Sequence, residues 1–122
     1  MKKIEVPTKI QMGSYVVKVK YPPTIEHEGN LVEGLSCAVD ATISVKVDKS
    51  TTESQVFSTL LHELSHIVLG RSGISNILGG YSPDGCLEEA IVVCLEHGLN
   101  PLFRVSEDTW VEQTTVRVSE DI

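Results

Sequence analysis

A helical repeat that carries two histidines four positions apart is the feature that most constrains this chain. Apolar residues recur every three or four positions from Val56 to Ile67, which is typical of an amphipathic helix. Ser50 and Glu53 fit the capping-box pattern at its start, and Gly70 is a natural residue for its end. We therefore expect one helix from the Ser50–Glu53 box to Leu69.

The two histidines, His62 and His66, are expected to project from one side of this helix. Residues four apart lie about 40° apart around a helix axis, so both imidazoles can bind one metal ion. With Glu63 they form an HExxH motif, His62-Glu63-Leu64-Ser65-His66. Zinc lowers the pKa of a bound water towards about 7, and Glu63 can then take the proton as the water attacks a carbonyl. The alternative is that these residues form only a solvated helix face.

Catalytic zinc requires a third protein ligand. Glu88 and Glu89 begin an otherwise apolar segment, where a buried carboxylate would need a counter-charge. They could instead stabilise the positive end of that helix, and two adjacent acids can fill both roles. The full set of candidates comprises four acids and a histidine: Asp84, Glu88, Glu89, Glu96 and His97.

The HExxH motif followed by Glu88-Glu89-Ala90-Ile91 resembles the gluzincin branch of zinc metallopeptidases, whose third ligand is a glutamate on the next helix. This resemblance implies Glu89 as the ligand, with Glu88 as the alternate, and one Zn²⁺ per chain. The small size and short sheet resemble the minimal metallopeptidases of phages and mobile elements, which are ImmA/IrrE-like in layout. The resemblance covers roughly residues 35–99 and implies hydrolysis of a peptide bond in a specific protein partner.

One position departs from the gluzincin pattern. Gluzincins often place Asp or Asn one turn after the ligand glutamate to support a histidine, whereas this chain has Val93 one turn after Glu89. We therefore expect support from Asp40, Asp48 or a backbone carbonyl. The departure favours, as the alternative function, a zinc-binding regulatory or protein-binding module with weak or no catalysis. A purely structural domain without metal is the third possibility.

Two further side chains and one strand are candidates for handling the substrate. Tyr81 and His97 are the best placed to help steady an oxyanion, although either could be structural. The alternating strand at residues 42–47 lies along the cleft in zincin-like folds, where it can pair with an extended peptide.

The remaining patterns predict an α+β, zincin-like fold. Alternation predicts a strand at residues 15–21 and a hairpin of residues 35–39 and 42–47. A Gly- and Ser-rich loop is expected from residue 71 to about 82, and a deeply packed second helix from about 83 to 98. We expect a small mixed or antiparallel sheet packed on the HExxH helix, with the second helix carrying the third ligand. The tail holds strand-like Val116 and Val118, and Trp110 could dock on the domain.

Length and charge limit the class of protein. A chain of 122 residues has room for a single domain, 1–122, with an acidic C-terminal extension from about residue 104. The net charge of −7 argues against nucleic acid or anionic membrane as partner, and no apolar stretch is long enough to span a membrane. The start, MKKIEVPTKI, lacks the apolar core of a secretory signal. The three cysteines fit free thiols in the core. We therefore expect a cytoplasmic protein, in a bacterial host if phage-encoded.

Overall fold

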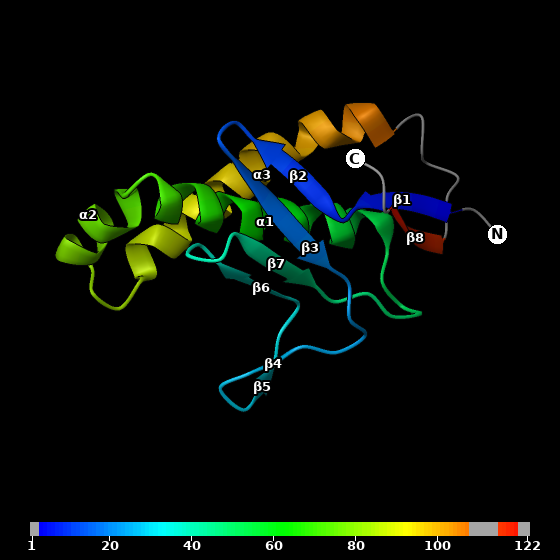
Figure 1. Ribbon diagram of the computed structural model, residues 1–122, viewed down its shortest axis with the longest axis horizontal. Coiled ribbons are helices and arrows are strands. Elements are labelled where there is room, and N and C mark those ends of the chain that lie inside the picture. Colours follow the sequence, from blue (N-terminus) through cyan, green and yellow to red (C-terminus); the bar gives the residue numbers. More distant parts are fainter. Residues whose placement is uncertain (1–2, 108–114, 120–122) are drawn as a thin grey trace.

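The computed structural model describes residues 3–107 and 115–119. These residues form eight strands and three helices in an α+β arrangement (Figure 1). The elements are β1 (Lys3–Pro7), β2 (Lys9–Met12), β3 (Tyr15–Lys20), β4 (Glu26–His27), β5 (Asn30–Leu31), β6 (Gly34–Cys37), β7 (Thr42–Val45), α1 (Glu53–Arg71), α2 (Ile74–Tyr81), α3 (Cys86–Glu107) and β8 (Thr115–Ser119).

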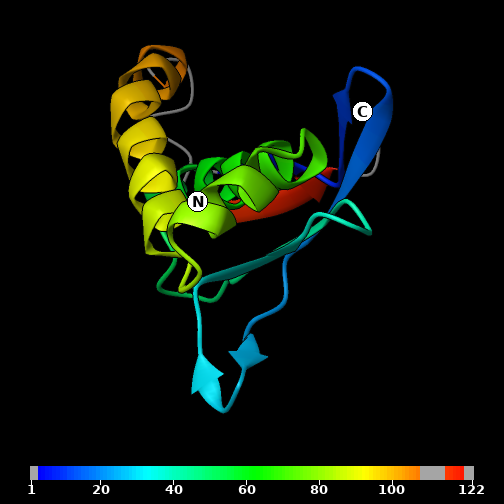
Figure 2. The same ribbon diagram turned by 90° about the vertical axis from the view of Figure 1, so that its left-hand side faces the viewer.

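The main sheet is mixed and has the strand order β2-β3-β7-β6. The inner strands β3 and β7 are parallel, whereas β2 and β6 pair with them in antiparallel fashion. The expected α+β class is therefore confirmed, with a mixed sheet. A separate parallel pair joins β1 to β8, and the small β4–β5 hairpin projects away from the body of the protein (Figure 2).

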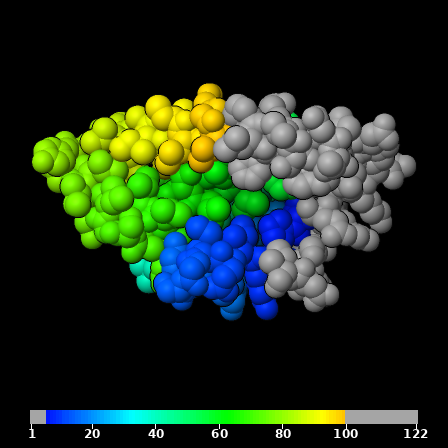
Figure 3. Space-filling model, turned by 90° about the horizontal axis from the view of Figure 1, so that it is seen from above, coloured from blue at the N-terminus to red at the C-terminus, as the bar shows by residue number. Residues whose placement is uncertain are grey.

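Helix α1 lies in the centre of the protein. Figure 3 shows it between α3 on one side and the β2–β3 hairpin on the other. Its inner face carries Val56, Leu60 and Ile67, which pack with Val17 and Ile43 of the sheet in one aliphatic core. The alternation in β3 buries Val17 and Val19 and exposes Val16 and the two lysines, as period-two patterning predicts. The core therefore holds α1 against the sheet and leaves the opposite side of the helix for α3.

The start of α1 is capped by a different residue pair from the expected one. Thr52 is the N-cap: its side chain accepts from the backbone N–H of Gln55 (3.3 Å), and the Gln55 side chain accepts from the Thr52 N–H (2.8 Å). The predicted box of Ser50 and Glu53 is wrong because Ser50 donates both its N–H and its hydroxyl to Asp48. The helix itself begins and ends within two residues of the prediction.

Three other expectations are corrected. The segment predicted as a loop after residue 71 contains α2, because Ile74, Ile77 and Leu78 supply a helical apolar repeat despite the glycines. Helix α3 is not deeply packed: among its described side chains only Val92 is fully buried, because one face contacts α1 and α2 and the rest meets solvent. All three cysteines are exposed and are not core residues.

The chain ends were only partly predicted. The strand expected around Val116 and Val118 is confirmed as β8, but its partner β1 was not expected. The expected acidic extension begins inside α3, whose backbone is described to Glu107. Trp110 lies outside the described residues.

Gly70, near the end of α1, is required by a close approach to the β6–β7 turn. A Cβ at this position would lie 2.5 Å from the Cβ of Ala38. A Gly→Ala change inside a helix ordinarily stabilises by about 0.5–1 kcal/mol, whereas overpacking costs about 1–3 kcal/mol.

We expect Gly70→Ala to lower the free energy of unfolding by about 1–2 kcal/mol, because the clash outweighs the gain in helix propensity. Chemical denaturation would measure the change. Gly98→Ala in α3, where nothing lies within 4 Å of the added Cβ, is the matched control and should be neutral or stabilising. Ala38→Gly should rescue Gly70→Ala, and a failure to rescue would contradict the assigned contact.

Candidate metal centre

The HExxH motif lies in the middle of α1, on the side that faces α3. His62 and His66 are adjacent on this side, and their ring centroids are 5.2 Å apart. Both side chains are about four-fifths buried, with 21% of each exposed. The predicted spacing on a helix therefore places two imidazoles next to each other at the helix–helix interface.

Glu89 of α3 bridges the two histidines. Its Oε1 lies 2.9 Å from Nε2 of His62, and its Oε2 lies 2.9 Å from Nε2 of His66. One ligand atom from each of the three residues can be chosen so that all lie within 4.8 Å of one another. Two imidazole nitrogens and one carboxylate form a donor set that suits zinc, so these residues fit one such ion.

The other nitrogen of each ring faces a second glutamate. His62 Nδ1 lies 2.7 Å from Oε1 of Glu96, and His66 Nδ1 lies 2.6 Å from Oε2 of Glu88. A carboxylate that hydrogen-bonds to Nδ1 fixes the orientation of an imidazole and directs its Nε2 towards a metal. Glu88 therefore lies where it supports His66, while Glu89 lies where a ligand is needed.

Each supporting glutamate is itself held by a serine hydroxyl. Ser58 of α1 donates to Glu96 (2.5 Å), and Ser75 of α2 donates to Glu88. Asp40 and Asp48, which were expected to provide this support, instead bond to residues near them in the chain. The prediction considered only the position one turn after Glu89, which is Val93, and then turned to acids outside α3, whereas Glu96 lies two turns after Glu89.

The sequence contains a signal for Glu96 that the prediction did not use. Residues seven apart lie on nearly the same side of a helix, so Glu89 and Glu96 project together. Because α1 and α3 cross with His66 beside Glu88 and His62 beside Glu96, the two helices run in opposite directions here. Glu96 was considered only as a ligand, whereas its position suits a supporting role.

The pKa values of the site show the balance between burial and hydrogen bonding. Burial alone would raise the pKa of Glu88 and Glu96, but bonds from the serines and histidines outweigh it and lower both. Burial alone would lower the pKa of His66, but its bond to Glu88 and the charges of Glu89 and Glu63 raise it. The supporting carboxylates therefore stay ionised at neutral pH and can accept from Nδ1–H.

Glu63 lies on the cleft side of α1 and is 9% exposed. It accepts no hydrogen bond from any residue in the described part of the chain. Gly34 of β6 lies against it: a Cβ on Gly34 would be 2.6 Å from Thr59 Cγ2 and 3.0 Å from Glu63 Cγ. The strand can approach the helix this closely only because residue 34 has no side chain, and this approach confines the Glu63 carboxylate to the cleft.

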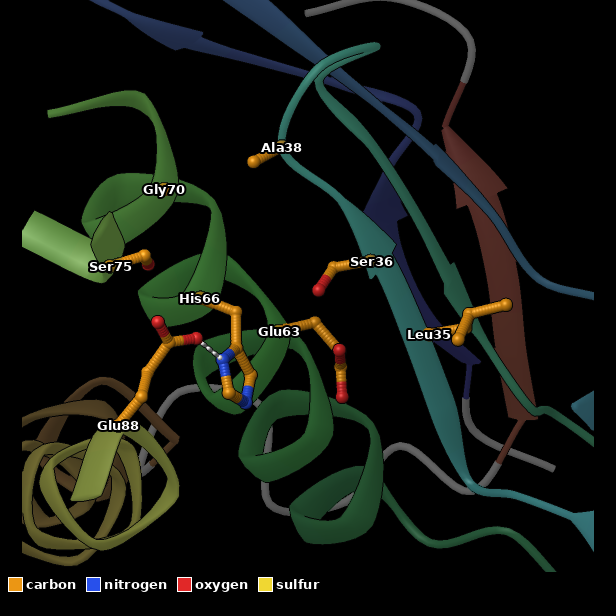
Figure 4. Close-up of a pocket in the computed structure, with 8 residues that line it drawn as sticks. All are labelled: Leu35, Ser36, Ala38, Glu63, His66, Gly70, Ser75 and Glu88. Carbon is orange, nitrogen blue, oxygen red and sulfur yellow. Dashed lines mark hydrogen bonds and ion pairs between the residues drawn. The ribbon is translucent and has the colours of Figure 1, made fainter. Parts of the chain in front are cut away.

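The cleft beside Glu63 and His66 has a volume of about 360 Å³ and is open to solvent (Figure 4). It lies between the edge strand β6 and α1, with α2 and α3 at one end. Its lining combines small and acidic side chains: Leu35, Ser36, Ala38, Glu63, His66, Gly70, Ser75 and Glu88.

The expected cleft strand is replaced by its neighbour. β7 lies inside the sheet, paired with β3 and β6, so its backbone groups are already used. β6 is the edge strand and supplies the cleft wall. The prediction was wrong because the sequence shows which segments alternate but not which one lies at the edge.

The two proposed oxyanion residues do not line the cleft. Tyr81 ends α2 and is 83% exposed. His97 is exposed on α3 next to Glu96, and the charge of His97 helps to lower the pKa of the Glu96 carboxyl. The roles of Tyr81 and His97 remain predictions.

Asp84, a third-ligand candidate, accepts hydrogen bonds from Ser82 and from the Cys86 N–H at the start of α3.

Comparison of the chain with protein-family models, curated proteins and solved structures returned no match. Among the described residues, no helix is both long enough and apolar enough to cross a membrane.

We expect Glu96→Gln to weaken zinc affinity by about 10- to 100-fold, because the carboxylate that orients His62 and favours its metal-binding form is lost. Competition with a chelating dye would measure the dissociation constant. Ser58→Ala keeps the charge of Glu96 but removes its hydrogen bond, so it should produce a smaller loss. Glu26→Gln on exposed β4 is the charge-matched control, and an equal effect there would contradict the supporting role of Glu96.

Proposed function

We propose that this protein is a zinc-dependent peptidase with a zincin-like layout. The observation that carries the proposal is the convergence of His62 Nε2, His66 Nε2 and the Glu89 carboxylate, next to a buried Glu63 on an open cleft. Catalytic zinc sites in proteins use three protein ligands and leave one position open. A zinc ion held by these residues would supply Lewis acidity, which acidifies water and polarises a carbonyl group.

Glu63 is the proposed general base. Its carboxylate faces the cleft and has no hydrogen-bond partner among the described residues, so both of its oxygens are available for a proton. It would take a proton from the attacking water and deliver it to the nitrogen of the departing amine. Contact with β6 at Gly34 limits the positions of this carboxylate, which favours proton transfer over a short distance.

The edge strand β6 offers backbone groups to an extended peptide. The Lys46 N–H donates to the Glu33 carbonyl (2.9 Å), which marks that pair as hydrogen-bonded within the β6–β7 ladder. Because such pairs alternate in antiparallel strands, Gly34 and Ser36 direct their N–H and C=O groups outward. An extended substrate segment can add to this edge beside Glu63, and we propose a protein or peptide as the substrate.

The alternative is a zinc-binding regulatory or protein-binding module with weak or no catalysis. Its main support was the missing acid one turn after Glu89. Glu96 and Glu88 contact the two imidazoles in its place, so this ground for the alternative is weaker. A role in a phage or mobile-element circuit stays a prediction.

We expect Glu63→Gln to lower peptide hydrolysis by about 100- to 10,000-fold and to retain about one zinc per chain, because the general base is lost while the three ligands remain. Mass spectrometry of a digested peptide mixture would measure cleavage, and elemental analysis would measure zinc. Glu26→Gln is again the matched control. Wild-type activity without zinc, or full activity in Glu63→Gln, would overturn the proposal.

We expect Ser36→Pro to raise KM for peptide cleavage by about three- to tenfold, because one outward N–H donor is lost. The stability of the fold should change little, since that N–H is not part of the β6–β7 ladder. Ser36→Ala controls for the side chain and should resemble the wild type. Leu35→Pro removes an inward donor and should destabilise the protein, so equal effects at both positions would contradict the edge-strand assignment.

A further inference from the structure

The cleft beside Glu63 has a strongly acidic lining. Glu63 lies on its α1 wall and Glu88 on its α3 wall; Figure 4 shows Glu63 directed towards β6 and Glu88 directed towards His66, which lies between them in this view. Besides these two carboxylates and His66, the lining residues are uncharged, and no lysine or arginine is among them. A ligand that fills this cleft therefore meets two carboxylates and no fixed cation.

A bound zinc ion would not cancel this charge. Glu89 and Glu96 lie on the other side of the histidines, so four glutamates surround the place where one dication would bind. The net charge of the whole chain is −7, which adds to the local negative potential. The cleft therefore keeps an excess of negative charge when the site is loaded.

The basic residue next to the cleft is held away from it. Arg71 follows Gly70 on α1, but its guanidinium donates to the carbonyl oxygens of Ala38 (3.2 Å) and Val39 (3.3 Å). The guanidinium carbon also lies 4.3 Å from the ring centroid of Tyr15. These contacts fix Arg71 on the β6–β7 turn, so it does not neutralise Glu63 or Glu88.

Glu63 is the second observation that points to a cation. Its side chain is nine-tenths buried, lines the cleft and has no hydrogen-bond partner among the described residues. Its carboxylate already interacts electrostatically with His66, and as an acid on an open cleft it would also attract a cation that enters there. The small side chains of Ser36, Ala38 and Ser75 leave space for a long aliphatic stem with a charged end.

We propose that this cleft accepts the positively charged side chain of a lysine or arginine next to the cleaved bond. The proposal rests on the peptidase function proposed above and adds its substrate class. The ammonium or guanidinium group would lie near Glu88, and its stem along the cleft. Acidic side chains would be excluded by repulsion, so selectivity comes from both attraction and like-charge exclusion.

The test uses zinc-loaded protein and three Nα-acetylated amino-acid hydroxamates, whose shared hydroxamate can bind zinc while their side chains differ. Calorimetry would give the dissociation constants of the lysine, norleucine and glutamate derivatives. We expect the lysine compound to bind about tenfold tighter than the norleucine compound of similar shape, and the glutamate compound to bind weakest. Cleavage of a random peptide mixture should show the same preference at one of the two positions flanking the cleaved bond.

Two arginine variants separate the cleft from the overall charge. Ser36→Arg places a cation in the cleft and should reduce the lysine preference to threefold or less. Ser14→Arg, in the exposed β2–β3 turn, changes the net charge equally and should leave the preference unchanged.

The outcomes separate the two proposals. Protein that holds zinc but binds the three compounds equally, or prefers glutamate, overturns the cleft assignment and leaves the peptidase proposal standing. Equal loss of preference in both arginine variants also overturns the cleft assignment. Protein that holds no zinc overturns the peptidase function, and the substrate class with it.

Discussion

The candidate centre depends on the contact between α1 and α3, where one carboxylate lies between two imidazoles. Glu89 is half exposed and lies in the first turn of α3, where a negative charge also suits the helix end. The two histidines are its partners, and Glu88 and Glu96 bind the remaining ring nitrogens. Five side chains from two helices thus form one polar network whose hydrogen-bonding groups are matched, which is the condition for a polar interface to be stable.

Much of this centre could be predicted from sequence because it follows helix periodicity. The spacing of His62 and His66 requires only a helix, and the apolar repeat supplies one. The sequence also contained the acids that the second helix contributes, and the structure places Glu89 where the resemblance expected a ligand. Local rules were sufficient here because each inference involved one helix at a time.

Apart from the capping box of α1 and the missed helix α2, which are local, the expectations that failed needed information about how elements meet. The support from Glu96 depends on the antiparallel crossing of α1 and α3, which no single-helix pattern contains. The identity of the cleft strand depends on sheet order, so β6 could not be distinguished from β7. The exposure of α3 shows the same limit: an apolar helix predicts burial, but the number of neighbouring elements decides how much of its surface is covered.

The contact of Gly34 with Thr59 and Glu63 has a consequence for how such a site can change. The residue that would meet a substrate backbone and the residue that would move a proton touch each other without an intervening side chain. Any shift of β6 that accommodates a new substrate would therefore displace the carboxylate that we propose as the general base, and any larger residue at position 34 would do so directly. In the proposed peptidase, substrate recognition and chemistry would be mechanically coupled at this point, so adaptation to new substrates would proceed more freely through the far end of the cleft.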